Sequence, residues 1–311
     1  MIEEILKKYP FILLDGAFST ELERKGFSIC DELWSAIALY KRPDLVKSVH
    51  LSYYQTGSDI VTGASYQATL EGFEKKGFFR KEAASLLRRS VTLVQEARDI
   101  YLASAKAENR PAPLTAASVG PYGAYLADGS EYRGHYGKTK EELIHFHRER
   151  MHILAEAGPD LFACETIPCL IEAEALSQVL HEIPNAAAWI SFSCKDRLHT
   201  CGGDLIAHCA EVLNRVKEVK AIGINCTAPE YVESLIGEIR KHTEKPVIIY
   251  PNSGEHYDTD EKTWAGAAAP YEDYVRTWYN AGARLIGGCC RTTPEDIEKV
   301  SAFRQELLKK R

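Results

Sequence analysis

No stretch of this 311-residue chain stays apolar over the roughly 18 residues that a membrane-spanning helix needs. The sequence therefore offers no candidate transmembrane helix. An excess of basic residues is also missing, because 38 lysines and arginines stand against 44 aspartates and glutamates, which gives a net charge of −6. Proteins that bind nucleic acids generally carry a basic face, so the composition argues against a nucleic-acid partner.

Signals for export are missing as well. The N-terminal segment 1–8 is charged and lacks the apolar core of a signal peptide. We therefore expect a cytoplasmic protein, in which the nine cysteines are thiols or metal ligands rather than disulfides. There is no Cys-x-x-Cys motif, which excludes zinc ribbons and thioredoxin-type redox sites.

Eight short apolar runs recur along the chain, and each ends on small or polar residues. They are rich in β-branched residues. Uninterrupted runs of this kind are typical of strands that are buried on both faces of a parallel sheet. The predicted strands cover residues 11–16, 60–65, 114–121, 161–168, 187–194, 221–226, 246–252 and 283–290.

Helical patterns separate these runs. One example is Leu45, Val49 and Tyr53, which share a helix face after Pro43. Eight strands alternating with helices fit either an open doubly wound sheet or a closed (β/α)8 barrel of the TIM type. We favour a single barrel domain over residues 1–311, because the strand count is eight and no dinucleotide-binding glycine motif follows the first strand.

Other segments fall outside the barrel strands. Longer spacing in the first half of the chain predicts enlarged loops over the barrel mouth, at about 27–31, 69–81 and 122–138. Residues 2–9 are expected to form a helix that closes the opposite end. His145, His147 and His152 fall on a charged helix, so we expect them to be solvent-exposed rather than to bind a metal.

In barrels of this type the chemistry is carried by residues at the C-terminal ends of the strands. Every one of these positions holds a polar or thiol side chain: Asp15, Ser65, Ser118, Glu165, Cys194, Cys226, Asn252 and Cys289-Cys290. Asp15 and Glu165 are the only carboxylates among them. An ordinary turn at Asp15-Gly16 and a helix cap at Glu165-Thr166 are the structural alternatives.

Three of the cysteines can form one metal site. Cys226 ends the sixth strand and Cys289-Cys290 end the eighth, so the strand ends lie roughly 10 Å apart at about 4.8 Å per strand. Thiolates from both sides can reach a common zinc ion at about 2.3 Å. Both adjacent cysteines can face the ion only where the strand has ended and Gly287-Gly288 lets the backbone turn. Three thiolates with one open position describe a catalytic zinc site.

Packing is the structural alternative, because cysteine is among the most frequently buried residue types. On spacing alone this alternative stays open for the three cysteines above. For the remaining six we expect packing in the core: Cys30, Cys164, Cys169, Cys194, Cys201 and Cys209.

Seven longer motifs include all of the strand-end residues named above except Cys194. They are LLDGA (13–17), ASYQAT (64–69), SVGPYGAYLADGSEYRG (118–134), CETIP (164–168), GINC (223–226), YPNSGE (250–255) and GGCCRTTP (287–294). Together they resemble the homocysteine S-methyltransferase family over residues 11–305. Within that family the chain is most similar to the cobalamin-independent members that use S-methylmethionine.

The resemblance implies a (β/α)8 barrel with one zinc ion per chain, which moves a methyl group from a sulfonium donor to the thiolate of L-homocysteine and forms methionine. It implies Cys226, Cys289 and Cys290 as zinc ligands. Asp15 and Glu165 would hold the ammonium group of homocysteine, and the backbone from Gly16 on would lie near its carboxylate. S-methylmethionine is the expected donor, with S-adenosylmethionine or betaine as alternatives.

The sulfonium cation of such a donor would be stabilised by aromatic faces or carboxylates at the barrel mouth. Tyr122, Tyr125 and Trp34 are candidates, and a core or lid role is the alternative for each. Two other functions compete with methyl transfer. A zinc hydrolase would need a general base beside the metal, and a thiol or metal sink would not need Asp15 and Glu165 at the same mouth.

Overall fold

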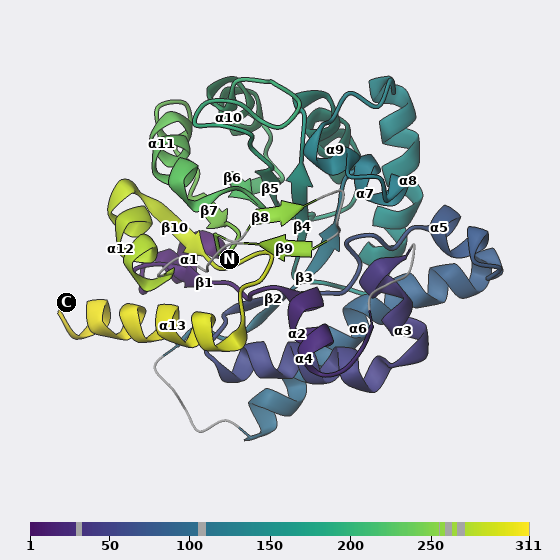
Figure 1. Cartoon of the computed structure of the whole chain (residues 1–311), viewed down its shortest axis with the longest axis horizontal. Helices are drawn as coiled ribbons and strands as arrows, with labels where there is room; N and C mark the ends of the chain where they lie inside the picture. Colours follow the sequence, from purple (N-terminus) through teal and green to yellow (C-terminus); the bar gives the residue numbers. More distant parts are fainter. Residues whose placement is uncertain (29–32, 105–109, 255, 259–262, 266–270, 311) are drawn as a thin grey trace.

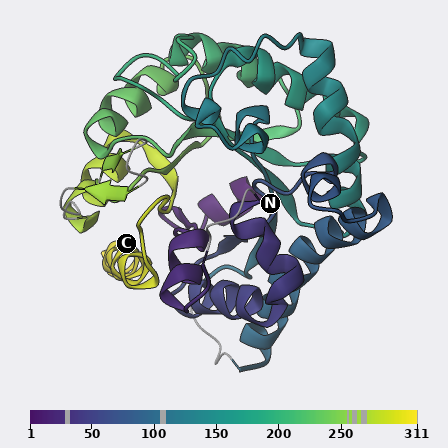
Figure 2. The same cartoon turned by 45° about the vertical axis from the view of Figure 1, so that its right-hand side comes forward.

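The computed structural model describes residues 1–28, 33–104, 110–254, 256–258, 263–265 and 271–310. Eight parallel strands form one sheet in the order β1-β10-β7-β6-β5-β4-β3-β2. A parallel bridge between Leu14 and Ile60 joins the two edge strands and closes the sheet into a barrel. Helices surround the strands as an outer layer (Figures 1 and 2). The (β/α)8 barrel predicted from the eight apolar runs is confirmed.

Each barrel strand overlaps one of the predicted runs. The strands are β1 (Ile12–Leu13), β2 (Ile60–Thr62), β3 (Leu114–Val119), β4 (Leu161–Ile167), β5 (Ala188–Phe192), β6 (Val219–Asn225), β7 (Val247–Tyr250) and β10 (Ala283–Ile286). Most strands are shorter than the runs, because the polar residues at the ends of the runs have already left the sheet. Asp15, Cys226, Asn252 and the Cys289-Cys290 pair all lie just beyond a strand.

The outer layer is formed by amphipathic helices. They are α4 (Pro43–Gln55), α6 (Arg80–Ser104), α8 (Lys140–Glu156), α9 (Leu170–Glu182), α10 (Ile206–Asn214), α11 (Pro229–Arg240), α12 (Tyr271–Ala281) and α13 (Pro294–Lys309). Pro43 occupies the first helical position of α4, as its place in the sequence predicts. Within the described ranges, no helix is long and apolar enough to cross a membrane.

The barrel interior has its own apolar cluster, distinct from the layer between strands and helices. It includes Ile12, Ile60, Trp189 and Leu285, whose side chains are almost fully buried. Helix α1 (Ile2–Leu6) adds Ile2 to the same cluster. The N-terminal helix therefore closes the bottom of the barrel, as predicted for residues 2–9, and leaves the opposite end open.

The connections over the open end contain short helices where the sequence predicts loops. Helix α5 (Leu70–Lys75) lies within the predicted loop 69–81, and α7 (Tyr122–Leu126) and the 3-10 turn η2 (Ser130–Tyr132) lie within 122–138. Before α4 the chain forms α2 (Phe18–Arg24), η1 (Trp34–Ile37) and α3 (Ala38–Lys41). Residues 29–31 of the predicted loop 27–31 lie outside the described residues.

A further insertion, which the sequence did not predict, follows β7. Two short strands, β8 (His256–Asp258) and β9 (Thr263–Ala265), pair in antiparallel fashion between β7 and α12. Enlarged connections are therefore not confined to the first half of the barrel.

The last helix is tied to the barrel by a buried ion pair. Asp59, which precedes β2, is fully buried and accepts a hydrogen bond from the backbone N–H of Leu13 at 2.9 Å. Arg304 of α13 is 1% exposed and forms a charged hydrogen bond to the same carboxylate. Removing one partner of a buried ion pair typically costs about 3–5 kcal/mol, so α13 is an integral part of the barrel.

His147 contradicts the expectation that the three histidines of α8 are solvent-exposed. His145 is exposed, but His147 is fully buried. Its Nε2 lies 2.9 Å from Oε1 of Glu172 on α9, and Arg150 donates to its Nδ1 at 2.8 Å. Burial, helped by the charge of Arg150, lowers the pKa of His147 to about 4, so the ring is neutral. Glu172 also accepts the backbone N–H of Tyr122 at 2.6 Å, which holds the start of α7 against α8 and α9.

Gly223 lies in β6 where a side chain would collide with β7. A Cβ there would overlap the carbonyl oxygen of Ile248 and lie 2.7 Å from its carbonyl carbon. We expect Gly223→Ala to lower the free energy of unfolding by about 3 kcal/mol or more, because neither buried strand can yield. Gly237 is the matched control, since it is exposed on α11 and a Cβ added to it would have no atom within 4 Å.

Gly237→Ala should raise the free energy of unfolding by about 0.5–1 kcal/mol, because alanine is the better helix former. Urea denaturation of both variants measures the two effects. Equal stability of the two alanine variants would contradict the close approach of β6 and β7.

Candidate active site

A cavity of about 1020 Å³, measured out to its open mouth, lies at the C-terminal ends of the barrel strands. All six residues that the sequence and the resemblance single out line it: Asp15, Gly16, Glu165, Cys226, Cys289 and Cys290. Ser118 also lines the cavity, whereas Ser65, Cys194 and Asn252 do not, although they too stand at strand ends. The prediction from the C-terminal strand ends therefore identifies the correct end of the barrel, but it includes three residues that do not line the cavity.

Three thiol side chains meet on one side of this cavity. The sulfur atoms of Cys226, Cys289 and Cys290 all lie within 4.8 Å of one another. Among the residues whose placement is described, they form the one group of His, Cys, Asp or Glu ligands suited to a metal ion. Cys226 Sγ lies 4.0 Å from Cys290 Sγ. Two sulfurs bound to one zinc ion at about 2.3 Å can be at most about 4.6 Å apart, so this separation fits a shared ion.

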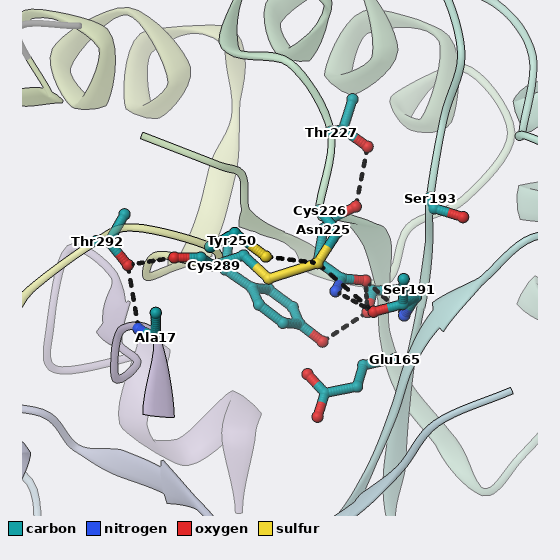
Figure 3. Close-up of a disulfide and its surroundings, with 12 residues drawn as sticks. Ala17, Glu165, Ser191, Ser193, Asn225, Cys226, Thr227, Tyr250, Cys289 and Thr292 are labelled. Carbon is teal, nitrogen blue, oxygen red and sulfur yellow. Dashed lines mark hydrogen bonds between the residues drawn. A yellow bond between two sulfur atoms is a disulfide. The ribbon is translucent and has the colours of Figure 1, made fainter. Parts of the chain in front are cut away.

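Cys226 and Cys289 are paired as a disulfide in the structure (Figure 3). This pairing contradicts the expectation that none of the nine cysteines forms a disulfide. Cys290 is a free thiol. Thiolates are the metal-binding form of cysteine, so all three residues can act as ligands only after the pair has been reduced. Cysteines gathered at one site can also be oxidised to a disulfide, and the sequence could not show which pair would form.

Most of the other cysteines are packed in the core, as expected. Cys164, Cys169, Cys194 and Cys209 are buried free thiols, and Cys201 is half-buried. Burial raises the pKa of Cys164 and of Cys169 to about 12, so both are protonated at neutral pH. Cys30 lies outside the described residues.

The turn that carries Cys289 and Cys290 packs closely against Leu14, just beyond β1, and against Thr292. Strand β10 ends at Ile286, as both cysteines require in order to reach the cavity. Neither Gly287 nor Gly288 has a positive φ, so the backbone freedom expected from the sequence is not what this turn uses. A Cβ on Gly287 would lie 2.5 Å from Leu14 Cβ, and one on Gly288 would lie 2.6 Å from Thr292 Cβ. The glycines are needed because a side chain would not fit.

Cys226 has an unusual backbone conformation that its neighbours hold in place. Its φ is +45°, which is uncommon for residues other than glycine. Asn225 Oδ1 accepts hydrogen bonds from Thr166 N at 2.7 Å and from Ser191 Oγ at 2.8 Å. Asn225 Nδ2 donates to Thr166 Oγ1 at 2.7 Å. This buried network fixes the end of β6 against β4 and β5 (Figure 3).

Glu165 is aimed into the cavity by an irregularity in β4. The register against β5 shifts between Cys164 and Ile167, and Thr166 has a φ of +61°. Such irregularities redirect side chains near active sites. Glu165 accepts a hydrogen bond from Ser118 Oγ, and burial raises its pKa to about 7. Its place inside β4 excludes the helix-cap alternative.

Asp15 is the second carboxylate of the cavity. Its Oδ2 accepts the backbone N–H of Thr62 at 2.7 Å, and its Oδ1 accepts the Thr62 hydroxyl at 3.3 Å. Burial is the main reason why its pKa is raised to about 8, and the charge of Glu165 adds to the effect. No lysine or arginine is found among the described residues that line the cavity. Within the described wall, these carboxylates have no basic side chain beside them, so the site suits a cationic group of a ligand.

Two of the three aromatic candidates for a sulfonium site lie elsewhere. Tyr122 and Tyr125 are not part of the cavity wall and pack against Phe146, with ring centroids 4.9 and 5.5 Å away. The side chain of Trp34 lies outside the described residues. Other aromatic residues line the cavity instead: Phe18, Tyr66, Tyr132 and Tyr250. Tyr66 and Tyr132 stand in the motifs ASYQAT and DGSEYRG, which was the sequence signal that could have identified them.

Comparison with known proteins adds to this geometry. The sequence model of the family described as homocysteine S-methyltransferase matches residues 12–303. The homocysteine S-methyltransferase YbgG of Bacillus subtilis is 53% identical over 309 residues, which cover 98% of each chain. The crystal structure of the homocysteine methyltransferase MmuM from Escherichia coli in its metallated form matches with a TM-score of 0.88 and 42% identity, over 97% of this chain and 99% of that chain. The oxidized form of the same protein matches with a TM-score of 0.88 and 43% identity, over the same shares of the two chains.

Proposed function

This chain belongs to the homocysteine S-methyltransferase family, and from that membership we propose that it transfers a methyl group from a sulfonium donor to the thiol of L-homocysteine and forms methionine. The observation that carries the proposal is the cavity, where three cysteines and two half-buried carboxylates line one wall and no lysine or arginine lines the described part of it. We propose S-methylmethionine as the preferred donor, because segment 122–134 resembles the members that use it. S-adenosylmethionine is the alternative donor.

Cys226, Cys289 and Cys290 would hold one zinc ion per chain. Their sulfur atoms lie close enough to share an ion, and a set of thiolate ligands favours zinc over the harder cations magnesium and calcium. Three protein ligands leave one position open, as in catalytic zinc sites. When bound, the ion supplies the positive charge that lowers the pKa of the acceptor thiol and favours its thiolate form.

Asp15 and Glu165 would hold the ammonium group of homocysteine. A buried ammonium needs a counter-charge, and these carboxylates have none from the described wall of the cavity. An ammonium between them would favour their ionised forms and so reverse their raised pKa values. The substrate carboxylate would lie near the backbone of Gly16. The next amide, Ala17, already donates to Thr292 Oγ1 at 3.1 Å, so this role falls to Gly16 rather than to Ala17.

The reaction is a displacement at the methyl carbon. A lone pair of the homocysteine sulfur forms the new S–C bond while the S–C bond of the donor breaks, and that electron pair stays on the donor sulfur. The thiol proton of homocysteine goes to solvent when the thiolate forms. The donor leaves as a neutral thioether, so no general acid is required. The cavity walls contribute by aligning the two substrates. These small molecules are the partners we propose, and the cytoplasmic location stays a prediction.

Product analysis tests this function. The reduced, zinc-loaded protein is supplied with S-methylmethionine and with homocysteine that is isotope-labelled in its carbon chain. We expect half of the methionine to carry the label, because one product molecule comes from each substrate. We also expect kcat/KM to be higher with S-methylmethionine than with S-adenosylmethionine. No methionine with either donor would overturn the function, and a preference for S-adenosylmethionine would overturn only the choice of donor.

A further inference from the structure

One carboxylate of the cavity has no role in the reaction described above. Glu131, in η2, lines the cavity and is 5% exposed. Its Oε2 is buried and has no hydrogen-bond partner in the described part of the protein. Buried carboxylate oxygens are normally hydrogen-bonded or paired with a cation. Glu131 therefore has the properties of a group whose partner is a ligand.

The neighbouring base does not neutralise this carboxylate. Arg133 donates to Ser130 Oγ at 3.1 Å and lies 3.6 Å from Asp128 Oδ2. Burial raises the pKa of Glu131 to about 7 despite the charge of Arg133. A cation bound beside the carboxylate would favour its ionised form again.

The position of Glu131 is fixed by its backbone contacts. Ser193 Oγ donates to the Glu131 carbonyl oxygen at 3.0 Å. A Cβ on Gly123 would lie 2.5 Å from Glu131 N, so α7 packs directly against this residue. Helix α7 is itself held by the bond from Tyr122 N to the buried Glu172. The carboxylate is thus presented to the cavity by a supported segment rather than by a loose loop.

Glu131 and the two acceptor carboxylates reach the cavity from different elements. Glu131 lies in η2, after β3, whereas Asp15 follows β1 and Glu165 lies in β4. The rings of Tyr66 and Tyr132 line the cavity together with Glu131. Aromatic faces attract cations as carboxylates do, so this wall suits a second positive group.

We propose that Glu131, together with Tyr66 and Tyr132, forms the subsite for the sulfonium group of the methyl donor. The inference rests on the proposed function, in which both substrates bring a positive charge to one cavity. Two cations at the same pair of carboxylates would repel each other, and a separate carboxylate for the donor removes that conflict. The sulfonium charge disappears as the methyl group leaves, so Glu131 stabilises the bound donor more than the transition state.

The test compares Glu131→Gln with the full-length wild-type protein in its reduced, zinc-loaded form. Calorimetry without homocysteine should show S-methylmethionine binding roughly 10- to 50-fold more weakly to the variant, because a charged partner is lost. The donor KM should rise by a similar factor and kcat should not fall, while the homocysteine KM and the zinc content stay within about twofold of wild type. Binding of methionine, which lacks the sulfonium charge, should also change less than about twofold.

Two further variants separate a local contact from other effects. Glu131→Asp keeps the charge and should bind S-methylmethionine more tightly than Glu131→Gln. Glu23→Gln removes a charge from an exposed residue at the rim of the same cavity and should leave donor binding unchanged. If Glu131→Gln does not fold, the selectivity of Glu131→Asp for S-methylmethionine over methionine still tests the subsite.

The outcomes distinguish this inference from the proposed function. The subsite would be overturned if Glu131→Gln bound S-methylmethionine as tightly as the wild type does. It would also be overturned if the variant lost as much affinity for methionine as for S-methylmethionine. Neither result would contradict the proposed reaction. Loss of zinc in the same variant would show a structural role and also overturn it. A wild-type protein that forms no methionine would overturn the proposed function, and calorimetry with S-methylmethionine would still decide whether Glu131 binds the cation.

Discussion

Serine in place of Cys226, Cys289 or Cys290 is expected to abolish zinc binding and to lower the rate of methionine formation by roughly 1,000-fold or more. A neutral hydroxyl is a poor replacement for a thiolate ligand, so each variant should lose the ion. Without the ion the acceptor is a free thiol with a pKa of about 8.5, which is mostly protonated at pH 7. Elemental analysis of the purified protein and an assay of methionine formation measure the two losses together.

The barrel should remain folded in these variants, because the three cysteines lie beyond the strand ends and at most border the apolar core. Circular dichroism checks this point. Cys201→Ser is the matched control, since Cys201 is a half-buried free thiol outside the cavity wall, and it should keep both zinc and activity. Zinc must be loaded under reducing conditions because of the Cys226–Cys289 disulfide. Full activity after any one of the three ligand substitutions would contradict the metal assignment.

Glu165→Gln is expected to lower kcat/KM for homocysteine roughly 10- to 150-fold, which corresponds to the loss of about 1.5–3 kcal/mol from a charge-assisted hydrogen bond. Glutamine keeps the size of the side chain and can still bond to Ser118, but it cannot neutralise an ammonium group. Discrimination against 4-mercaptobutyrate, a thiol without the amino group, should shrink in the variant. Zinc content should not change, because Glu165 is not a proposed ligand. A variant that loses its zinc, or that keeps wild-type kinetics with homocysteine, would contradict this role.

The pH dependence of kcat/KM for homocysteine provides an independent test of the roles of Asp15 and Glu165. Burial raises the pKa of Glu165 to about 7 and that of Asp15 to about 8. Only the ionised forms attract an ammonium group, so kcat/KM for homocysteine should rise with pH through this range, and the pair titrates as a coupled unit. In Glu165→Gln one of the two ionisations is gone and the rise should become shallower. An identical profile in both proteins would mean that Glu165 does not control acceptor binding.

The barrel could be predicted because strands buried on both faces of a parallel sheet have continuous apolar sequences, and the chain contains eight such runs. The short helices α5 and α7 could not, since they are too short to show a helical period and are held by packing against their neighbours. The burial of His147 was missed for a related reason. Its surroundings on α8 are charged, and its partner Glu172 comes from the next helix, so nothing local to the sequence indicated a buried pair.

The site could be predicted where a side chain follows directly from a strand. The residues at the ends of β1, β4, β6 and β10 were found in this way, and all of them line the cavity. Glu131, Tyr66 and Tyr132 reach the same cavity from the connections between strands and helices, where strand periodicity says nothing about direction. Gly287 and Gly288 were identified correctly but for the wrong physical reason, because their role is close packing rather than backbone freedom at the turn.

The ion pair between Asp59 and Arg304 has a consequence for the nascent chain. The two residues are 245 positions apart, so at a translation rate of about 5–20 residues per second roughly 12 to 50 s separate their synthesis. During this time β2 has been made and Arg110 can approach the buried carboxylate to 3.8 Å, but Arg304 of α13, which forms the charged hydrogen bond to it, does not yet exist. The edges of the unfinished sheet are also unpaired, and unpaired edges invite aggregation. We therefore expect barrel closure to follow the release of almost the whole chain from the ribosome, and truncations before Arg304 to be recovered mainly bound to chaperones or as aggregates.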